Sequence, residues 1–369
     1  MSLPGAGIEF YNGTQGAQGG GSSTFSGSHS ALTELDYASA GHTGFQPSGA
    51  YLTSPIAESD VTGLVSDLAG KEPTLTKGNL TATSPIQIDQ TRQVIGGAAV
   101  ISLLAAYTPR ERLTAARTYY VRTDGNDSNT GLVDSAAGAF LTIQKAVDTY
   151  QTLDCNGYDV TIKVGDGTYT AGGTITGRIG AGRLYITGNT STPANCFLSL
   201  TSKNGVNASG HPSVSGIYVS GFKIATTTGG DCIKASNGST IYYSNIEFGA
   251  CAGSHVQSTS FATIYINGPY TISGGAAVAH WLVQTFGLFG NAAGAVTVTL
   301  SGTPAFSWAF LLMIGQSIAV VTNQITFSGS GTGKKYEIVQ NAIANTYSSA
   351  TSYLPGNVSG TTASGGQYL

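Results

Sequence analysis

Three short stretches decide the fold: Ile217-Tyr-Val-Ser-Gly221, Ile241-Tyr-Tyr-Ser-Asn245 and Ile264-Tyr-Ile-Asn-Gly268. In each stretch two residues flank a tyrosine on the strand, a small polar residue follows, and a residue suited to a left-handed backbone closes the stretch. Neighbouring side chains of a β-strand point to opposite faces, so this alternation is that of a strand ending in a turn. Strands that recur at such nearly equal intervals predict the stacked coils of a parallel β-solenoid.

Two later stretches repeat the same positions. They close at Gly302 and Asn323, and they place Thr299 and Val320 in the slot that tyrosine occupies in the first three copies. The interval between closing residues stays nearly constant except from Gly268 to Gly302, where it is clearly longer. We interpret this long interval as a coil that holds an insertion, Ala276–Asn291. The five copies together predict a fold in which each coil buries the next.

The composition favours a β-rich protein with a weakly charged surface. Charged residues number 16 basic and 19 acidic, or 9% of the chain, whereas soluble proteins average about 25%. Glycine, with 52 residues, has about twice its usual share of roughly 7%. A net charge of −3 does not suggest nucleic-acid binding, which depends on clustered Lys and Arg. The chain also lacks the excess of Ala, Glu, Lys, Leu and Arg that a coiled coil needs. A β-rich chain with a weakly charged surface remains, which is typical of extracellular adhesive proteins.

Targeting and membrane signals are not recognisable in the sequence. Residues 1–21 have neither a basic start nor an apolar run, so we expect no signal peptide. The most apolar stretch, Ala305–Val321, is interrupted by polar residues and is shorter than the roughly 20 residues of a spanning helix. The cysteines lack Cys-x-x-Cys spacing, and we expect them to be buried small apolar residues rather than disulfide or zinc ligands. They are Cys155, Cys196, Cys232 and Cys251.

The chain divides by texture into five segments. Residues 1–30 are rich in Gly and Ser and too poor in apolar residues to fold alone. Residues 31–90 hold short segments broken by Gly and Pro, and residues 91–118 form a linker with a basic end. We expect the solenoid over residues 119–345 and a C-terminal tail over residues 346–369.

Two helices are predicted within this β-rich texture. The first lies in Ala57–Gly70, where apolar residues recur at helical spacing: Val61, Leu64, Val65 and Leu68. A helix of about three turns is marginal alone, so this one is expected to pack against copies of itself or a partner. The second lies in Ala139–Tyr150 and has one apolar face: Phe140, Ile143, Val147 and Tyr150.

Several motifs resemble one family of proteins. Tyr119–Gly131 followed by Ala139–Ala146 is similar to the start of right-handed parallel β-helices of the pectate-lyase-like type, in which a helix then plugs the first coil. Leu35–Phe45 and Val61–Thr81 resemble the spacer regions of bacteriophage tail fibres and tailspikes, and Tyr353–Tyr368 resembles their C-termini. The resemblance covers most of the chain and carries no motif for an activity.

The resemblance implies an all-β homotrimer with an N-terminal capping helix on its right-handed β-helix. An extended N-terminal spacer or attachment region would bind other phage virion proteins. The β-helix would point outward and recognise the host surface, with bacterial surface polysaccharide as the ligand. The expected localisation is the virion, as part of a tail fibre or spike assembled in the host cytoplasm.

Candidate catalytic groups are scarce. Cleavage of a glycan usually takes two carboxylates at a separation set by the mechanism. Residues 248–333 contain no Asp, Glu, Lys or Arg, so within them only His255 or His280 remains for acid–base chemistry. Asp231 and Glu247, close in sequence and expected on adjacent coils, are the best remaining pair, although ordinary residues of surface turns are the simpler explanation. We therefore expect recognition without catalysis; the alternatives are a polysaccharide depolymerase and a structural spacer that binds no receptor.

No segment of the sequence has a complete metal-binding or cofactor-binding motif. Asp124–Gly131 is rich in oxygen donors, but position 135, where a calcium loop would need Glu, is Ser135. A turn dense in Asn, Asp and Gly explains this loop without a metal. The Gly-rich N-terminus lacks the Gly-Lys-Ser/Thr of a phosphate loop. The histidines have no metal-ligand spacing, so we expect neither a metal nor a cofactor; they are His29, His42, His211, His255 and His280.

The tyrosines of the repeat are the candidate binding residues. If Ile217 and Val219 point inward, Tyr218 points outward, and the same holds for Tyr242 and Tyr265. They would stack about 4.8 Å apart, the spacing of neighbouring strands. A tyrosine ring has an apolar body and a polar tip, which suits sugars and protein interfaces alike. Glycan contact, burial at a trimer interface and plain strand propensity all remain open for these residues.

Overall fold

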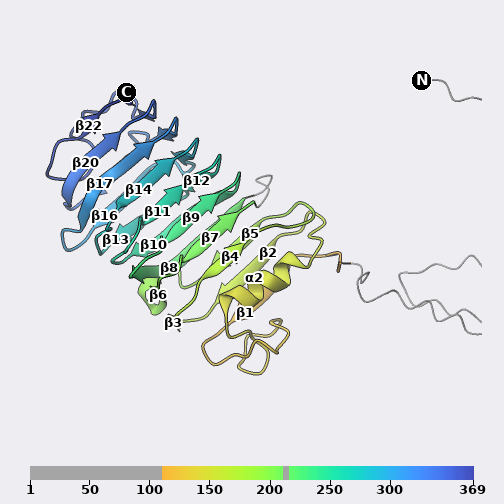
Figure 1. Cartoon of the computed structure of the whole chain (residues 1–369). Coiled ribbons are helices and arrows are strands. Elements are labelled where there is room, and N and C mark those ends of the chain that lie inside the picture. Colours follow the sequence, from red (N-terminus) through yellow and green to blue (C-terminus); the bar gives the residue numbers. More distant parts are fainter. Residues whose placement is uncertain (1–109, 211–215) are drawn as a thin grey trace, which may run out of the picture. The chain divides into compact units, whose positions relative to one another are not determined.

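A computed structural model describes residues 110–210 and 216–369, and these residues form an all-β solenoid (Figure 1). Parallel strands stack coil upon coil for about eight turns. In this part of the chain no helix is long and apolar enough to span a membrane. The segments expected over residues 1–30 and 31–90, the helix in Ala57–Gly70 and most of the linker lie outside the described residues.

The strands form three faces, and the strands within each face are parallel. Each strand pairs with the equivalent strand of the coils before and after it. Face 1 consists of β1 (Arg117–Val121), β2 (Val160–Val164), β5 (Leu184–Thr187), β8 (Ile217–Thr227), β10 (Thr240–Phe248), β12 (Thr263–Ile266), β15 (Leu288–Asn291), β18 (Ile318–Val320), β21 (Ile343–Asn345) and β23 (Gln367–Tyr368). Face 2 consists of β3 (Gly167–Tyr169), β6 (Cys196–Thr201), the second halves of β8 and β10, β13 (Tyr270–Ile272), β16 (Val296–Leu300) and β19 (Ile325–Ser328).

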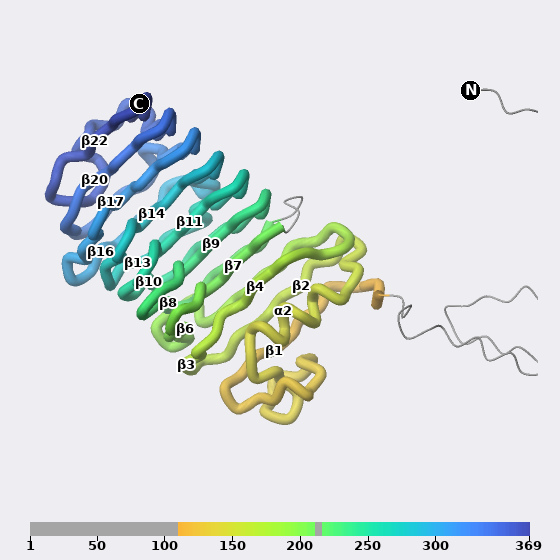
Figure 2. Tube along the Cα trace, viewed as in Figure 1, coloured from red at the N-terminus to blue at the C-terminus, as the bar shows by residue number. Residues whose placement is uncertain are grey.

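Face 3 is a separate sheet of eight strands, seen at the front of Figure 1. It consists of β4 (Gly173–Ile175), β7 (Val206–Ser209), β9 (Ile233–Ser236), β11 (Val256–Ser258), β14 (Ala279–Gln284), β17 (Ala305–Ile314), β20 (Thr332–Ile338) and β22 (Thr361–Thr362). A short 3-10 helix, η5 (Pro193–Asn195), precedes β6. Figure 2 follows the chain from coil to coil through the three faces.

The core is built from columns of identical strand positions. On face 1, Ile217 pairs with Ile241, which pairs with Ile264, and all three are fully buried. The alternation that predicted these strands thus sends every second residue inward. Burying one such side chain stabilises the fold by about 1.5–3 kcal/mol, so each added coil contributes to holding its neighbours.

Left-handed residues bend two long strands, β8 and β10, from face 1 to face 2. Gly221 in β8 and Asn245 in β10 have φ of +78° and +49°, as the sequence predicts. A Cβ on Gly221 would lie 2.8 Å from backbone atoms of the preceding coil, so the close approach also requires glycine. Asn323, the last residue expected in this conformation, does not adopt it.

Helix α2 (Ile143–Gln151) lies between β1 and β2 in the sequence. It buries Ile143, Ala146, Val147 and Tyr150 and packs against β1, β2 and β4. The predicted helix began at Ala139, but the observed one begins after Thr142, whose hydroxyl caps the backbone N–H of Lys145. Phe140 therefore joins the core from an isolated bridge to Val121 rather than from the helix.

One part of the predicted register is wrong. Leu288–Asn291, which we interpreted as an insertion, is β15 and pairs with β12, so Gly290 rather than Thr299 follows Tyr265 on face 1. Thr299 belongs to β16 and pairs with Thr271 of face 2. The error arises because β16 has the alternation and the Ser-Gly ending of a face 1 strand. Val320 does lie in the predicted slot, paired with Gly290.

The strand ladders continue past residue 345, where the sequence placed the end of the solenoid. β22 pairs with β20, and β23 pairs with β21. Leu354 is fully buried, and the hydroxyl of Tyr353 donates to the carbonyl oxygens of Thr322 and Ile325. Strands as short as β22 and β23 carry no readable alternation, which is why the sequence suggests a tail here.

Candidate functional site

A ladder of tyrosines stands on the outer side of face 1. Tyr218 pairs with Tyr242 in the strand register, and Tyr242 pairs with Tyr265. The ring centroids of Tyr218 and Tyr242 are 4.6 Å apart with planes 7° apart, and those of Tyr242 and Tyr265 are 5.1 Å apart. The three residues therefore occupy one slot in consecutive coils, as the alternation predicts.

The ladder has a fourth ring, which the sequence analysis missed. Tyr185 of β5 pairs with Tyr218, and their ring centroids lie 5.1 Å apart. The coil between these two residues is longer than the later ones, since it holds η5, β6 and β7. The interval read from the later coils therefore does not reach Tyr185. The motif Leu184-Tyr-Ile, which matches Ile217-Tyr-Val, was the available signal.

Each end of the tyrosine ladder, defined as Tyr185, Tyr218, Tyr242 and Tyr265, is distinct. At one end Arg183 donates to the Tyr185 hydroxyl over 3.2 Å, and its guanidinium lies 5.6 Å from the Tyr218 ring centroid. At the other end the slot is filled by Gly290, where a Cβ would lie 3.2 Å from the Tyr265 ring. The tyrosine ladder is thus bounded by the cation of Arg183 beside Tyr185 and by Gly290 beside Tyr265.

The rings are half-buried because their faces cover one another. Burial is the main cause that raises the pKa of Tyr242, and the flanking phenols Tyr218 and Tyr265 raise it further, so its phenol is protonated at neutral pH. What the ladder presents outward is therefore a row of ring edges and hydroxyls. Each hydroxyl can donate one hydrogen bond and accept others.

The candidate catalytic residues Asp231 and Glu247 have different hydrogen-bond and ion-pair partners. Asp231 precedes β9 of face 3; its Oδ1 accepts the Ser254 backbone N–H over 2.8 Å, and its Oδ2 lies 3.7 Å from Lys234 Nζ. Burial raises the pKa of Asp231. The carboxyl of Asp231 therefore ties one coil to the next.

Glu247 lies on the face 2 half of β10. Its Oε1 lies 2.7 Å from Lys223 Nζ and accepts a hydrogen bond of 2.7 Å from Ser273 Oγ. Burial alone would raise the pKa of Glu247, but the hydrogen bonds from Lys223 and Ser273 outweigh it and lower the pKa. In the described part of the chain Glu247 and Asp231 share no hydrogen-bond or ion-pair partner.

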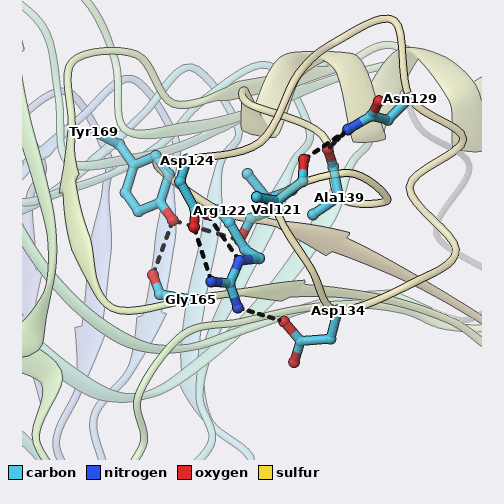
Figure 3. Close-up of polar contacts among 9 residues, drawn as sticks. Val121, Arg122, Asp124, Asn129, Asp134, Ala139, Gly165 and Tyr169 are labelled. Carbon is cyan, nitrogen blue, oxygen red and sulfur yellow. Dashed lines mark hydrogen bonds and ion pairs between the residues drawn. The ribbon is translucent and has the colours of Figure 1, made fainter.

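The loop that was weighed as a calcium site uses its side chains within the chain (Figure 3). Arg122 forms ion pairs with Asp124 at 2.8 Å and with Asp134 at 3.1 Å, and its hydrogen bond is the main cause that lowers the pKa of Asp124. Asn129 donates through Nδ2 to the carbonyl oxygens of Ala136 and Ala139. The dense Asn and Asp content is thus accounted for by turn and capping contacts.

Asp127 links this loop to helix α2. Its Oδ1 accepts the backbone N–H groups of Leu141 and Thr142, both over 2.9 Å, and its Oδ2 accepts the Thr142 hydroxyl over 2.7 Å. A carboxylate at this place satisfies N–H groups next to the start of the helix, where no intrahelical acceptor exists.

Two histidines that looked scattered in the sequence meet in the core. Nδ1 of His255 lies 3.0 Å from Nδ1 of His280, and both residues are fully buried. They belong to adjacent coils, because Val256 of β11 pairs with Trp281 of β14. Their separation in sequence is close to the length of one coil, which was the readable signal. All four cysteines are also buried, as predicted, and all are free thiols.

Trp308 is a surface residue that the sequence analysis did not single out. It lies in β17 and is 49% exposed, whereas the second tryptophan, Trp281, is fully buried. Its indole Nε1 donates to Glu337 Oε2 over 2.9 Å, and Lys334 Nζ donates to the same oxygen over 2.5 Å. No repeat signal marks Trp308, because it sits where the pairing of β17 with β20 is irregular.

A cavity of about 400 Å³ lies apart from the tyrosine ladder. Its lining comes from helix α2, β4 and three corner segments, and it includes Gln144, Thr174, Lys203 and Asn204. The lining contains one cation and no carboxylate, so it offers no pair of acids for glycan hydrolysis.

Among the residues that the structure describes, no group of three or more His, Cys, Asp or Glu side chains is arranged to hold a metal ion. The tyrosine ladder is therefore the most extended surface feature for which a binding role can be argued. Comparison of the chain with family models, curated proteins and solved structures found no match.

Proposed function

We propose that this protein is a bacteriophage tail fibre or tailspike subunit that recognises the host surface without catalysis, and that its tyrosine ladder binds bacterial surface glycan. The observation that carries the proposal is the stack of four half-buried tyrosines in register on the outer side of face 1. The motifs Leu35–Phe45, Val61–Thr81 and Tyr353–Tyr368, with their resemblance to phage fibre proteins, support the virion assignment.

The geometry of the stack limits how a glycan would bind. The inner rings already use both faces on their neighbours, so a sugar cannot stack on them. It would instead lie across the ring edges and exchange hydrogen bonds with the row of hydroxyls. Centroid spacings of 4.6–5.1 Å are comparable to one sugar unit of an extended chain, so successive units would meet successive rings.

A role without catalysis is supported by the state of the candidate acids. Asp231 is held by Ser254 and Lys234, and Glu247 is held by Lys223 and Ser273. Each carboxyl is thus engaged in contacts with neighbouring side chains and backbone. A depolymerase on the same fold would have to find its carboxylates elsewhere.

The proposal includes a homotrimer of right-handed parallel β-helices, in which α2 caps the first coil and the N-terminal region attaches to other virion proteins. A patch of exposed apolar side chains supports a subunit contact: Phe261 and Phe286 are 67% and 43% exposed, and Leu288 and Ile318 are 39% and 41% exposed. Leu288 pairs with Ile318 on the outer side of face 1, beyond Tyr265. Exposed apolar side chains that gather in one place usually mark an interface.

This patch also favours the second candidate role for the tyrosine ladder, burial between subunits. The two roles differ in what the hydroxyls do. At an interface the ring area matters most, whereas a glycan depends on the hydroxyl row.

The test compares Tyr242→Phe with Tyr242→Ala. Binding of the full chain to an array of purified bacterial capsular polysaccharides and lipopolysaccharides is measured alongside its oligomeric mass and melting temperature. The proposal predicts weaker glycan binding for both variants with the oligomer intact. Loss of the oligomer in Tyr242→Ala alone, with binding unchanged in Tyr242→Phe, would assign the ladder to the interface. Release of reducing ends from any bound glycan would establish the depolymerase instead.

A further inference from the structure

Trp308 owes its exposure to a β-bulge. The register of β17 against β20 shifts between Phe306 and Ala309, and the two residues between them are displaced outward. Phe306 and Ala309 stay buried, whereas Trp308 is 49% exposed. Bulges re-aim individual side chains and are frequent next to functional sites. A local irregularity of the backbone thus places a large aromatic side chain on the surface.

The indole is fixed in one orientation. Its N–H donates to Glu337 Oε2 over 2.9 Å, and that oxygen also accepts from Lys334 Nζ over 2.5 Å. Both bonds use the same carboxylate oxygen, and within the described residues Oε1 of Glu337 has no hydrogen-bond partner. The arrangement therefore combines a rigid aromatic surface with a free acceptor and an amine beside it. A side chain that is already ordered loses less conformational entropy when a ligand binds.

A small cluster of buried apolar residues lies beside Glu337 in face 3. Leu282 and Leu312 pair across β14 and β17 and form a small cluster with Ala279 and Ala309, separate from the interior core. Leu312 in turn pairs with Glu337 of β20. Glu337, which accepts the hydrogen bond of the indole, is therefore next to apolar side chains rather than charged ones.

The same outward row contains an unmet hydrogen-bond acceptor. Gln257 pairs with Leu282, and the row continues from there through Leu312 to Glu337. Gln257 is 7% exposed, and its Oε1 has no hydrogen-bond partner in the described part of the chain. This oxygen is itself buried, so a ligand on this surface would contact Trp308, Glu337 and Lys334 only.

The charges of this surface are balanced. Lys334 is paired with Glu337, and at the other end of the row Lys234 is paired with Asp231. A surface without net charge gives no preference to a polyanion, and its ligand needs an apolar face together with hydroxyl groups. A neutral pyranose meets this description, because one face of the ring carries C–H groups and its edge carries hydroxyls.

We propose that Trp308, Glu337 and Lys334 form a carbohydrate subsite on face 3, in which a neutral sugar ring stacks on the indole and hydrogen bonds with Glu337 Oε1 and Lys334 Nζ. This subsite is built on a different face from the tyrosine ladder, and it does not depend on the function proposed for that ladder.

The exposed tryptophan provides the readout. Iodide added to the full-length protein quenches Trp308 and not the buried Trp281, so the quenching constant reports on the indole of the subsite. Methyl pyranosides of glucose, galactose, mannose and rhamnose serve as probes. We expect at least one of them to lower the quenching constant at least twofold at saturation. Failure of all four to protect Trp308 would overturn the proposal.

Variants provide a second measurement. Saturation-transfer NMR with the protecting sugar should show binding at least tenfold weaker in Trp308→Ala, about threefold weaker in Glu337→Ala and little changed in Tyr242→Ala. Unaltered binding in a folded Trp308→Ala protein would contradict the subsite. Because Tyr242→Ala tests the tyrosine ladder, failure of one site leaves the result for the other intact.

Discussion

Nδ1 of His255 faces Nδ1 of His280 at 3.0 Å inside the solenoid, and the hydrogen bonds around them fix which nitrogens carry protons. His255 Nε2 contacts the carbonyl oxygen of Gly249 at 2.9 Å, so this nitrogen must be the donor and Nδ1 the acceptor. His280 then donates through Nδ1, and its Nε2 accepts from the Tyr270 hydroxyl at 2.9 Å. Burial lowers the pKa of both histidines, so both rings are neutral at pH 7 and this arrangement of donors satisfies all three contacts.

This pair predicts that the solenoid loses stability in mild acid. Burial lowers the pKa of His255 to about 4, and burial together with His255 lowers that of His280. The unfolded chain takes up these protons near pH 6.5 and the folded chain only at lower pH, so the contribution is complete above pH 6.5 and is lost as the pH falls toward 4. The slope approaches about 1.4 kcal/mol per pH unit for each histidine.

The measurement is the free energy of unfolding between pH 5 and 7 for the wild type and a His255→Asn/His280→Asn double variant. The difference between the two should shrink as the pH falls. Tyr270→Phe is the control: it removes one hydrogen bond, keeps both histidines and should keep the slope. Parallel curves for the wild type and the double variant would show that the pair does not titrate as described.

Gly221 and Gly302 provide a matched test of the corner geometry. Both are left-handed, with φ of +78° and +71°, but a Cβ on Gly221 would lie 2.8 Å from backbone atoms whereas one on Gly302 would meet nothing within 4 Å. Gly302→Ala should therefore cost only the backbone strain of about 1–2 kcal/mol. Gly221→Ala should cost clearly more, because a whole coil has to shift. Equal losses in chemical denaturation would argue against the close approach at Gly221.

Asp127 is predicted to stabilise the start of the solenoid as a capping residue. Asp127→Ala removes three hydrogen-bond acceptor contacts and should lower the free energy of unfolding by about 1–3 kcal/mol, with Asp127→Asn in between. Because these contacts involve no metal, EDTA and added calcium should leave the melting temperature of the wild type unchanged. A melting temperature that rises with calcium would restore the calcium interpretation of Asp124–Gly131.

Phe261 and Phe286 are predicted to serve association rather than folding. They have φ of +62° and +61° in successive turns, a conformation that costs a bulky residue about 1–2 kcal/mol, and their exposed rings stack at 5.0 Å. A Phe261→Asn/Phe286→Asn variant relieves this strain but loses the stacking, so the stability of the single chain should change by less than about 1 kcal/mol. Its self-association in sedimentation experiments should weaken.

Tyr347 supplies the control for that experiment. It is likewise exposed and left-handed, with φ of +55°, but it follows β21 and stacks on neither phenylalanine. Tyr347→Asn should leave self-association unchanged. If it weakens association as much as the double variant does, the effect is not specific to the stacked pair.

Much of the fold could be predicted because one physical pattern repeats. Inward and outward residues alternate in Ile217-Tyr-Val and again one coil later, and parallel pairing then forces the tyrosines into one column. The pattern failed where two faces look alike, as in β16, whose Val298 and Leu300 belong to face 2. Alternation reveals a strand but not the face of the solenoid on which it lies.

The candidate sites were predictable only where they follow the repeat. The tyrosine ladder does so, apart from Tyr185, which is separated by a longer coil. Trp308 does not, because it depends on a bulge in β17, and a bulge is a property of the pairing between two strands rather than of either sequence. The partners of Asp231 and Glu247, such as Ser254 and Ser273, come from the next coil and carry no mark in the sequence.

The spacing of the rings in the tyrosine ladder does not depend on the number of residues in each coil. The stretch of chain from Tyr185 to Tyr218 is clearly longer than those that lead on to Tyr242 and Tyr265, yet the ring centroids are 5.1, 4.6 and 5.1 Å apart. Backbone hydrogen bonding between coils sets the distances, while the corner segments absorb every difference in length. Loops at the corners can thus be exchanged, lengthened or shortened during evolution or engineering without altering the periodicity that a repeating ligand would encounter. The spacing of side chains along such a face is therefore independent of the number of residues in each coil.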